Sequence, residues 1–225
     1  MKLTVFNGSP RGQHSNTRML LEHFLDGFMT SKDNTYELAY LNHLKSRDKF
    51  VTMFGEAECV LLAFPLYTDA MPAMVKTFIE SLEPLCGREG NPAIGFIVQS
   101  GFPEAIHSRA LERYLEKLAW RLGCRYIGTV IKGGVEGIRT MPSMMTRGLF
   151  KSLYLLGRKF GETGSFDRQI VLNLGKPERL TGLRLLSFRL IGRYLSRSKY
   201  WDRKLKENKA FDKRFARPYT DKAKS

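Results

Sequence analysis

Apolar residues along the first 175 positions follow two different patterns. Short continuous apolar runs, such as VLLAF at 60–64 and IGFIV at 94–98, are typical of parallel strands covered on both faces. Other segments repeat apolar residues every three or four positions, which predicts amphipathic helices. We expect strands at 2–6, 35–41, 58–64, 93–99 and 126–132. We expect helices at 15–29, 72–85, 104–122 and 142–160, with an irregular, partly helical crossover at 42–55.

The alternation of strands and helices indicates βαβ units. Such units have right-handed crossovers and build a doubly wound α/β fold around a parallel sheet. Ligands of these sheets bind beyond the carboxyl ends of the strands. The loops after the first, third and fourth strands, at 8–16, 65–72 and 100–104, are therefore expected to meet at one rim.

The first of these loops, with the sequence NGSPRGQHSNT, predicts an anion site. It joins a strand to a helix start, where unpaired backbone N–H groups and the helix dipole favour negative charge. Side chains add further donors, from Ser9, Arg11, Ser15, Asn16 and Thr17. Helix capping by Ser15 or Asn16 explains part of this cluster, and the remainder favours a terminal phosphate. Neither a Walker loop nor the G-x-G-x-x-G spacing is present.

The second and third loops combine rigid backbone with ring-bearing side chains. Pro65 and Pro72 bracket a stretch that contains Tyr67 and Met71, a mixture suited to a flat, partly polar ring. Packing of Tyr67 and Met71 into the core is an equally good interpretation. The third loop offers a close backbone approach at a glycine and an aromatic face at the following residue.

A fourth, glycine-rich loop spans 133–139 and ends in Arg139. Its arginine could meet an anionic group on a second substrate. A flexible turn with a solvated arginine is the interpretation that the sequence favours.

Composition narrows the class of protein. A chain of 225 residues with 43% hydrophobic content supports one domain with a substantial core. No apolar run approaches the roughly 20 residues of a membrane span, and the expected strand begins too early for a signal peptide. Three widely spaced cysteines predict a cytoplasmic protein without disulfides, each cysteine acting as a small buried hydrophobe. The four histidines show no ligand spacing, so no metal is expected.

The net charge of +15 is concentrated near the C-terminus. Residues 176–225 hold 16 Lys and Arg against 5 Asp and Glu, a net of +11, which suggests a boundary between domains 1–175 and 176–225. Helical spacing in this extension predicts an apolar face and a basic face. The apolar face comprises Leu183, Leu186, Leu190, Ile191 and Tyr194, and the basic face comprises Arg189, Arg193 and Arg197.

Three roles for this basic extension remain open. Packing on its own domain or on a dimer mate is favoured, because most amphipathic helices pack in this way. Contact with an anionic membrane surface is the second. Nucleic-acid binding is the third, and it is disfavoured because no recognised motif accompanies the charge.

The loops in this order resemble the flavodoxin-like NAD(P)H-dependent FMN reductase family. The stretches GSPR at 8–11 and SNT at 15–17 are similar to its phosphate loop. The stretch PLY at 65–67 with Pro72, Lys76, Phe78 and Ile79 is similar to its second flavin loop and the helix that follows. The similarity extends over roughly residues 1–165.

This resemblance implies a five-stranded parallel sheet in the order 2-1-3-4-5, non-covalent FMN, NADPH or NADH as electron donor, and a homodimer. The phosphate would be held by Ser9, Arg11, Ser15, Asn16 and Thr17. The ribityl chain and the ring would be lined by Pro65, Leu66, Tyr67, Thr68, Asp69, Ser100, Gly101 and Phe102.

Two features depart from the family pattern. The crossover at 41–47 lacks the cysteines with which some relatives hold an iron–sulfur centre, so none is expected. Gln13 and His14 also replace the short Lys/Asn/Gly-rich turn of many relatives.

The resemblance implies an FMN-dependent oxidoreductase that passes electrons from NAD(P)H to a quinone, a free flavin or a nitro- or azo-aromatic acceptor by a ping-pong mechanism. No catalytic side chain is expected, because the flavin carries the chemistry. One alternative is a flavodoxin-type electron carrier with a protein partner, which the length and basicity of the chain disfavour. Another is a flavin-free protein that binds a phospholigand or nucleic acid.

Overall fold

A computed structural model describes residues 1–43, 46–195 and 201–217. The chain divides into two compact units, Met1–Arg179 and Leu180–Ser225. The first unit includes residues 176–179. These residues are held there by hydrogen bonds from Ala105 N to Pro177 O and from Ile106 N to Glu178 O.

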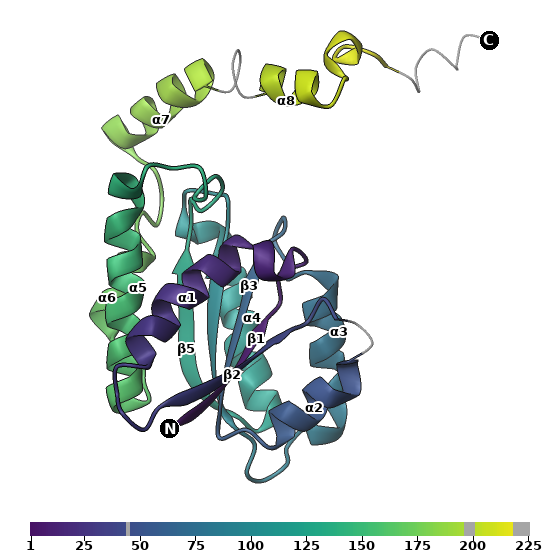
Figure 1. Ribbon diagram of the computed structural model, residues 1–225, viewed down its shortest axis with the longest axis vertical. Helices are drawn as coiled ribbons and strands as arrows, with labels where there is room; N and C mark the ends of the chain where they lie inside the picture. Colours follow the sequence, from purple (N-terminus) through teal and green to yellow (C-terminus); the bar gives the residue numbers. More distant parts are fainter. Residues whose placement is uncertain (44–45, 196–200, 218–225) are drawn as a thin grey trace, which may run out of the picture. The chain divides into compact units, whose positions relative to one another are not determined.

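The first unit is built on a five-stranded parallel sheet in the order β2-β1-β3-β4-β5 (Figure 1). Its strands are β1 (Lys2–Asn7), β2 (Thr35–Tyr40), β3 (Cys59–Pro65), β4 (Ala93–Gln99) and β5 (Arg125–Lys132). Every residue of β3 and β4 is buried, which explains their continuous apolar runs. The predicted fold class and strand order are confirmed.

Helices cover both faces of the sheet (Figure 1). One face carries α1 (Asn16–Phe28) and α5 (Ser143–Thr163), and the other carries α2 (Arg47–Gly55), α3 (Ala73–Ser81) and α4 (Arg109–Leu122). Short 3₁₀ turns are η1 (Gly12–His14), η3 (Glu83–Leu85) and η4 (Ala105–Ser108). The helix expected at 72–85 is divided into α3 and η3, and Pro84, which cannot donate an α-helical hydrogen bond, lies within η3. The sequence did not predict α6 (Arg168–Leu174).

Two glycines let α1 and α5 pack backbone against backbone. A Cβ atom on Gly27 would lie 1.9 Å from Tyr154 O, and one on Gly157 would lie 1.8 Å from Phe24 O. Since neither helix tolerates a side chain there, the position of α1 against α5 is fixed. This contact also fixes the N-terminus of α1 relative to the loop that precedes α5.

The second unit contains α7 (Gly182–Leu195), α8 (Trp201–Glu207) and the 3₁₀ turn η6 (Phe211–Lys213). A helix is therefore present where the basic amphipathic pattern predicted one. Arg197 and the side chains of Ile191, Arg193 and Tyr194 lie outside what the structure describes.

The three cysteines do not share one environment. Cys59 and Cys124 are buried, and burial raises the pKa of each thiol to about 11. Cys86 is exposed, so the expectation of a buried hydrophobe was wrong for this residue.

Within the described residues, no helix combines the length and the apolar character that crossing a bilayer requires. In the same part of the chain, no group of three or more His, Cys, Asp or Glu side chains is placed to hold a metal ion.

Candidate active site

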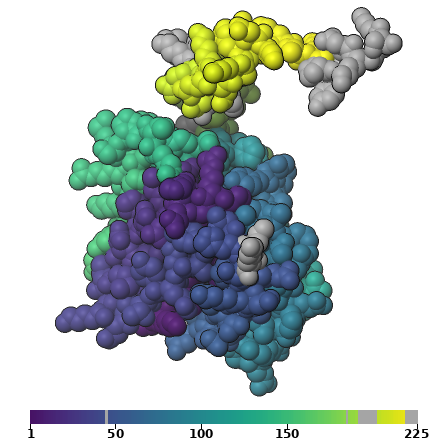
Figure 2. All heavy atoms as spheres, turned by 45° about the vertical axis from the view of Figure 1, so that its right-hand side comes forward, coloured from purple at the N-terminus to yellow at the C-terminus, as the bar shows by residue number. Residues whose placement is uncertain are grey.

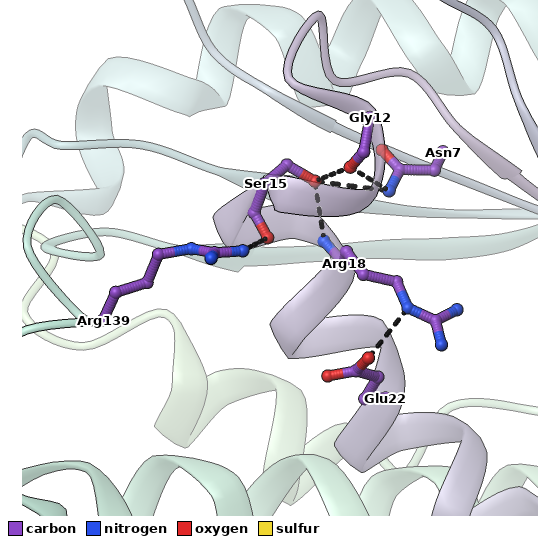
Figure 3. Close-up of polar contacts among 6 residues, drawn as sticks. All are labelled: Asn7, Gly12, Ser15, Arg18, Glu22 and Arg139. Atoms are coloured by element: carbon purple, nitrogen blue, oxygen red, sulfur yellow. Dashed lines mark hydrogen bonds and ion pairs between the residues drawn. The ribbon is translucent and has the colours of Figure 1, made fainter.

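The turn after β1 is held by two side chains that bond to its backbone (Figure 3). Asn7 Oδ1 accepts a hydrogen bond from Ser9 N at 2.9 Å, and Asn7 Nδ2 donates to Ser15 Oγ at 3.3 Å. Ser15 Oγ donates to Gly12 O at 2.6 Å and accepts from Arg18 N at 3.0 Å, which makes Ser15 the N-cap of α1. The Ser15 hydroxyl is therefore committed to the loop itself.

The first turn of α1 retains free backbone donors. Among the described residues, the N–H groups of Asn16 and Thr17 have no hydrogen-bond partner. No acidic residue lies in this turn to compensate the helix dipole. Ser9 is buried in the preceding turn, and the guanidinium of Arg11 is exposed beside it. This donor set has the chemistry of a phosphate site.

The side chains of Asn16 and Thr17 bond within the fold. Asn16 Nδ2 donates to Val135 O at 2.9 Å, and Thr17 Oγ1 accepts from Gln99 Nε2 at 3.3 Å. All four residues are buried. The polar cluster that the sequence assigned to phosphate binding thus also positions the helix, and the backbone of Asn16 and Thr17 is what remains available to a ligand.

The second loop is a tight turn that presents an aromatic ring. Tyr67 and Ala70 exchange two backbone hydrogen bonds of 2.9 and 3.2 Å, and Thr68 takes a positive φ of 57° between them. Tyr67 is 47% exposed, whereas Met71 packs against the hydrophobic core. Core packing, one of the two interpretations of this loop, therefore applies to Met71 and not to Tyr67.

The remaining residues of this loop divide into buried and exposed positions. Pro65 and Leu66 are buried, and Leu66 N donates to Gln99 O at 2.7 Å. Thr68 and Asp69 are exposed, and within the described residues their backbone N–H groups have no partner. The turn therefore offers an aromatic face and two backbone donors together.

The third loop places a second ring at the same rim. Ser100 is buried and donates from its hydroxyl to Phe102 O at 3.2 Å. The ring of Phe102 is 42% exposed and lies 4.6 Å from the His107 ring, centroid to centroid. A Cβ atom on Gly101 would lie 3.3 Å from Glu136 Cβ, so the third and fourth loops are in close contact.

The fourth loop, between β5 and α5, contacts both the third loop and α1. Val135 N donates to Ser100 O at 3.0 Å, and Gly134 N donates to Phe102 O at 2.8 Å. Arg139 Nη2 donates to Ser15 O at 3.0 Å (Figure 3). Arg139 is exposed, as the favoured interpretation expected, and it also bonds through one nitrogen to the start of α1.

Hydrogen bonds connect the four loops, together with the ends of β3 and β4, in a closed circuit. The links join Gly8 N to Ala63 O (2.7 Å), Leu66 N to Gln99 O (2.7 Å), Val135 N to Ser100 O (3.0 Å) and Asn16 Nδ2 to Val135 O (2.9 Å). In Figure 2 the purple N-terminal segment and the green segment near residue 140 adjoin on one surface, as these contacts require. The convergence that the topology predicted is thus present, with an additional fourth loop.

Three residues of this rim were not singled out from the sequence. Gln99 ends an apolar run with a polar side chain, which is a usable sign of a strand end. Lys132 is its register neighbour on β5 and shares its face, and burial lowers the pKa of its ammonium group. Val135 gave no sign, because its role depends on its backbone.

The sequence of residues 1–130 matches the family of NADPH-dependent FMN reductases. This chain belongs to that family. The resemblance deduced from the loops is therefore confirmed, and the FMN reductase uses FMN and a nicotinamide donor, as its family does. No curated protein sequence matches the chain.

Solved structures share the fold of this FMN reductase at low sequence identity. An FMN-dependent NADH-azoreductase from Bacillus anthracis, in complex with FMN, is 14% identical with a TM-score of 0.56, covering 72% of this chain and 100% of its own. An NADH:FMN oxidoreductase in its apo form is 17% identical with a TM-score of 0.55, covering 78% and 96%. An NAD(P)H:quinone oxidoreductase from Methanothermobacter marburgensis is 15% identical with a TM-score of 0.54, covering 71% and 96%.

Proposed function

We propose that this FMN reductase transfers two electrons from NADPH or NADH to a small acceptor in a ping-pong order. The acceptor class comprises quinones, free flavins and nitro- or azo-aromatic compounds. The closed circuit of four loops around the N-terminus of α1 carries the proposal, since it brings phosphate donors and exposed rings to one rim. The azoreductase and quinone oxidoreductase among the similar structures support this choice of acceptors.

The phosphate of FMN would bind at the start of α1. The N–H groups of Asn16 and Thr17 would donate to its oxygens, Arg11 would add a charged fork, and Ser9 a hydroxyl. Ser15 would act mainly by capping the helix. Because the backbone donors of α1 are fixed by the fold before the ligand arrives, little ordering free energy opposes their binding to it.

The ring system would lie between the second and third loops. Its surroundings would be Pro65, Leu66, Tyr67, Thr68 and Asp69 on one side and Ser100, Gly101 and Phe102 on the other. When bound, FMN supplies the hydride and electron chemistry. The backbone N–H groups of Thr68 and Asp69 are suited to stabilise negative charge on the ring, so no catalytic acid is assigned.

The electron balance defines the order of events. NAD(P)H gives up two electrons and a proton and leaves as NAD(P)⁺. The acceptor then gains two electrons and two protons, the second proton coming from solvent. The exposed faces of Tyr67 and Phe102 suit one open position that donor and acceptor occupy in turn.

Two measurements test this function. The purified protein should be yellow or should quench FMN fluorescence on titration, and double-reciprocal plots of NAD(P)H oxidation at several quinone concentrations should be parallel. A colourless protein that does not respond to FMN would contradict the placement of the cofactor. Intersecting lines would contradict the ping-pong order, and turnover only with a protein partner would favour an electron carrier.

We also propose that the enzyme is a cytoplasmic homodimer. Two adjacent apolar side chains at the start of α5, Met144 and Met145, are 85% and 68% exposed and support an interface between copies, and the free cysteines fit a reducing compartment. Sedimentation equilibrium should give a mass of two chains, and a monomer at micromolar concentration would contradict the dimer.

A further inference from the structure

Arg139 bonds to the peptide group that begins α1. Its Nη2 atom donates to Ser15 O at 3.0 Å, from the loop between β5 and α5 (Figure 3). The same carbonyl accepts the helical hydrogen bond from Met19 N at 3.3 Å. A cation thus lies against the carbonyl side of the Ser15–Asn16 peptide.

The opposite side of that peptide is a free donor. Ser15 C=O and Asn16 N–H belong to one planar amide, and this N–H is among those of α1 without a partner in the described residues. A charged donor on the oxygen draws electron density toward it, so the N–H becomes a stronger donor. The stronger hydrogen bonding is confined to the Asn16 N–H and to a ligand group that accepts from it.

We propose that Arg139 is a positioning residue for the phosphate of FMN and acts through the Ser15–Asn16 peptide. It polarises the Asn16 N–H and holds the first turn of α1 in place, with no need to touch the phosphate. This inference rests on the proposed binding of the phosphate at α1. It assigns to the fourth loop a specific contribution to the recognition of FMN over a flavin that lacks the phosphate.

The test compares FMN with riboflavin, which has the same ring and no phosphate. Fluorescence quenching gives both dissociation constants for the wild type, Arg139→Gln, Arg139→Lys and the control Arg147→Gln. Arg147 is exposed in the second turn of α5, so its replacement removes one positive charge from the first unit without touching Ser15. Thermal unfolding of the apo proteins verifies that each variant is folded.

We expect Arg139→Gln to weaken FMN binding about fivefold, the size of a modest charge-assisted hydrogen bond, and to leave riboflavin binding unchanged. Arg139→Lys should restore part of the affinity, and Arg147→Gln should match the wild type. If the wild type prefers FMN over riboflavin, two results would overturn the role of Arg139 alone. One is that Arg139→Gln weakens both ligands equally, and the other is that it leaves FMN binding unchanged. A wild type that binds both flavins equally would overturn the phosphate placement as well.

A second, independent observation concerns α7. Leu183, Leu186 and Leu190 are 84%, 52% and 61% exposed, and their spacing of three and four residues places them on one face of the helix. The surrounding segment, residues 176–225, carries a net charge of +11. The exposed leucines of α7 thus lie within a segment that carries excess positive charge.

This combination matches an anionic bilayer better than a nucleic acid. A helix lying in the headgroup region buries its apolar face, while its Lys and Arg residues attract anionic lipids. Proteins that bind single-stranded nucleic acids stack bases on aromatic rings. The second unit does expose Phe188 (50%) and Phe215 (81%), but such binding would leave the leucine face of α7 without a partner. We infer that α7 binds the surface of an anionic membrane through Leu183, Leu186 and Leu190.

Vesicle co-sedimentation of the full chain tests this inference. Binding is measured with phosphatidylcholine vesicles and with vesicles containing phosphatidylglycerol, for the wild type and for the variant Leu183→Ser/Leu186→Ser/Leu190→Ser. The control is Leu172→Ser, a leucine on α6 of the first unit whose exposed fraction of 50% is close to that of Leu186. We expect the triple variant to lose at least about tenfold in partitioning to anionic vesicles, because three leucines no longer enter the interface.

Added salt should weaken wild-type binding to anionic vesicles, because it screens the basic residues. Equal binding to neutral vesicles, or an unaffected triple variant, would overturn the inference. The inference would also be overturned if the wild type sedimented with neither vesicle type and instead bound nucleic acid. A triple variant that changed only the oligomeric mass of the protein would overturn it as well.

Discussion

Gln99 Nε2 donates a hydrogen bond of 3.3 Å to Thr17 Oγ1, which joins the last residue of β4 to the first turn of α1. Both side chains are buried, so neither group has water as a ready alternative partner. The bond connects β4, the strand that precedes the third loop, to α1, the helix that follows the first loop. It therefore sets the distance between the proposed phosphate and ring positions.

Thr17→Val keeps the shape of this side chain and removes its acceptor. We expect a loss of about 1–2 kcal/mol in the free energy of unfolding, because the Gln99 amide remains buried without its partner. Thr17→Val/Gln99→Met removes both polar groups and should lose less than the sum of the two single variants. Urea unfolding of the apo proteins measures the cycle, and strictly additive losses would show that the bond contributes nothing.

Gly8, in the first loop, packs closely against β3 and α3, the strand and the helix on either side of the second loop. A Cβ atom there would lie 2.3 Å from Val75 Cγ2 and 3.1 Å from Phe64 Cβ, both in buried residues. Gly8→Ala must therefore displace the loop or α3, and we expect a loss of about 1–3 kcal/mol in unfolding free energy. FMN affinity should fall as well, since the donors of α1 move with the loop.

Gly148→Ala is the matched control for Gly8. It lies within α5, and an added Cβ would meet no atom within 4 Å. Alanine should be neutral or should stabilise the helix by up to about 1 kcal/mol. Thermal unfolding and FMN titration of both variants suffice, and equal behaviour of the two would show that the close approach at Gly8 is tolerated.

The strands of the sheet could be predicted because each is marked by a pattern of neighbouring residues. Burial on both faces produces runs such as 60–64 and 94–98, and these became β3 and β4 with boundaries displaced by no more than one residue. Ser15 as a cap is equally local, since its bonds reach only from Asn7 to Arg18. The proposed phosphate loop has the same local character.

The fourth loop was not predictable in the same way. Asn16 and Val135 are 119 residues apart in sequence, and Val135 takes part only through its backbone. Arg139 and Ser15 are 124 residues apart, and the sequence around Arg139 is the same as that of an ordinary glycine-rich turn. Such contacts depend on how the helices pack. Gly27 and Gly157 determine the packing of α1 on α5, because a side chain at either position would clash with the other helix, and composition does not reveal this.

Tyr67 is expected to contribute to ring binding and little to stability. Its side chain is 47% exposed, and the turn around it is held by backbone bonds that Tyr67→Ala leaves intact. We expect a stability change within about 0.5 kcal/mol. Loss of an aromatic contact should weaken FMN and riboflavin by the same factor, about threefold to tenfold. A selective effect on FMN would instead place Tyr67 at the phosphate, contrary to the proposed arrangement.

Glu178 ties the end of the first unit to α4. Arg109 donates to both of its carboxylate oxygens, with a shortest distance of 2.7 Å between Nη2 and Oε2, and these hydrogen bonds lower the pKa of Glu178. Because the folded pKa lies below the unfolded one, the pair stabilises the protein above the ordinary carboxyl value. The stabilisation is lost as the pH falls through the lowered value.

Glu178→Gln should therefore destabilise the protein at pH 7 and have almost no effect near about pH 2, where the wild-type carboxylate is also protonated. The carboxylate is about half exposed, and screening by solvent limits the loss to about 1 kcal/mol or less. The control Glu56→Gln removes an exposed carboxylate that forms no ion pair among the described residues. Urea unfolding at both pH values provides the measurement, and a loss that persists at the acidic pH would assign the contribution of Glu178 to packing instead of charge.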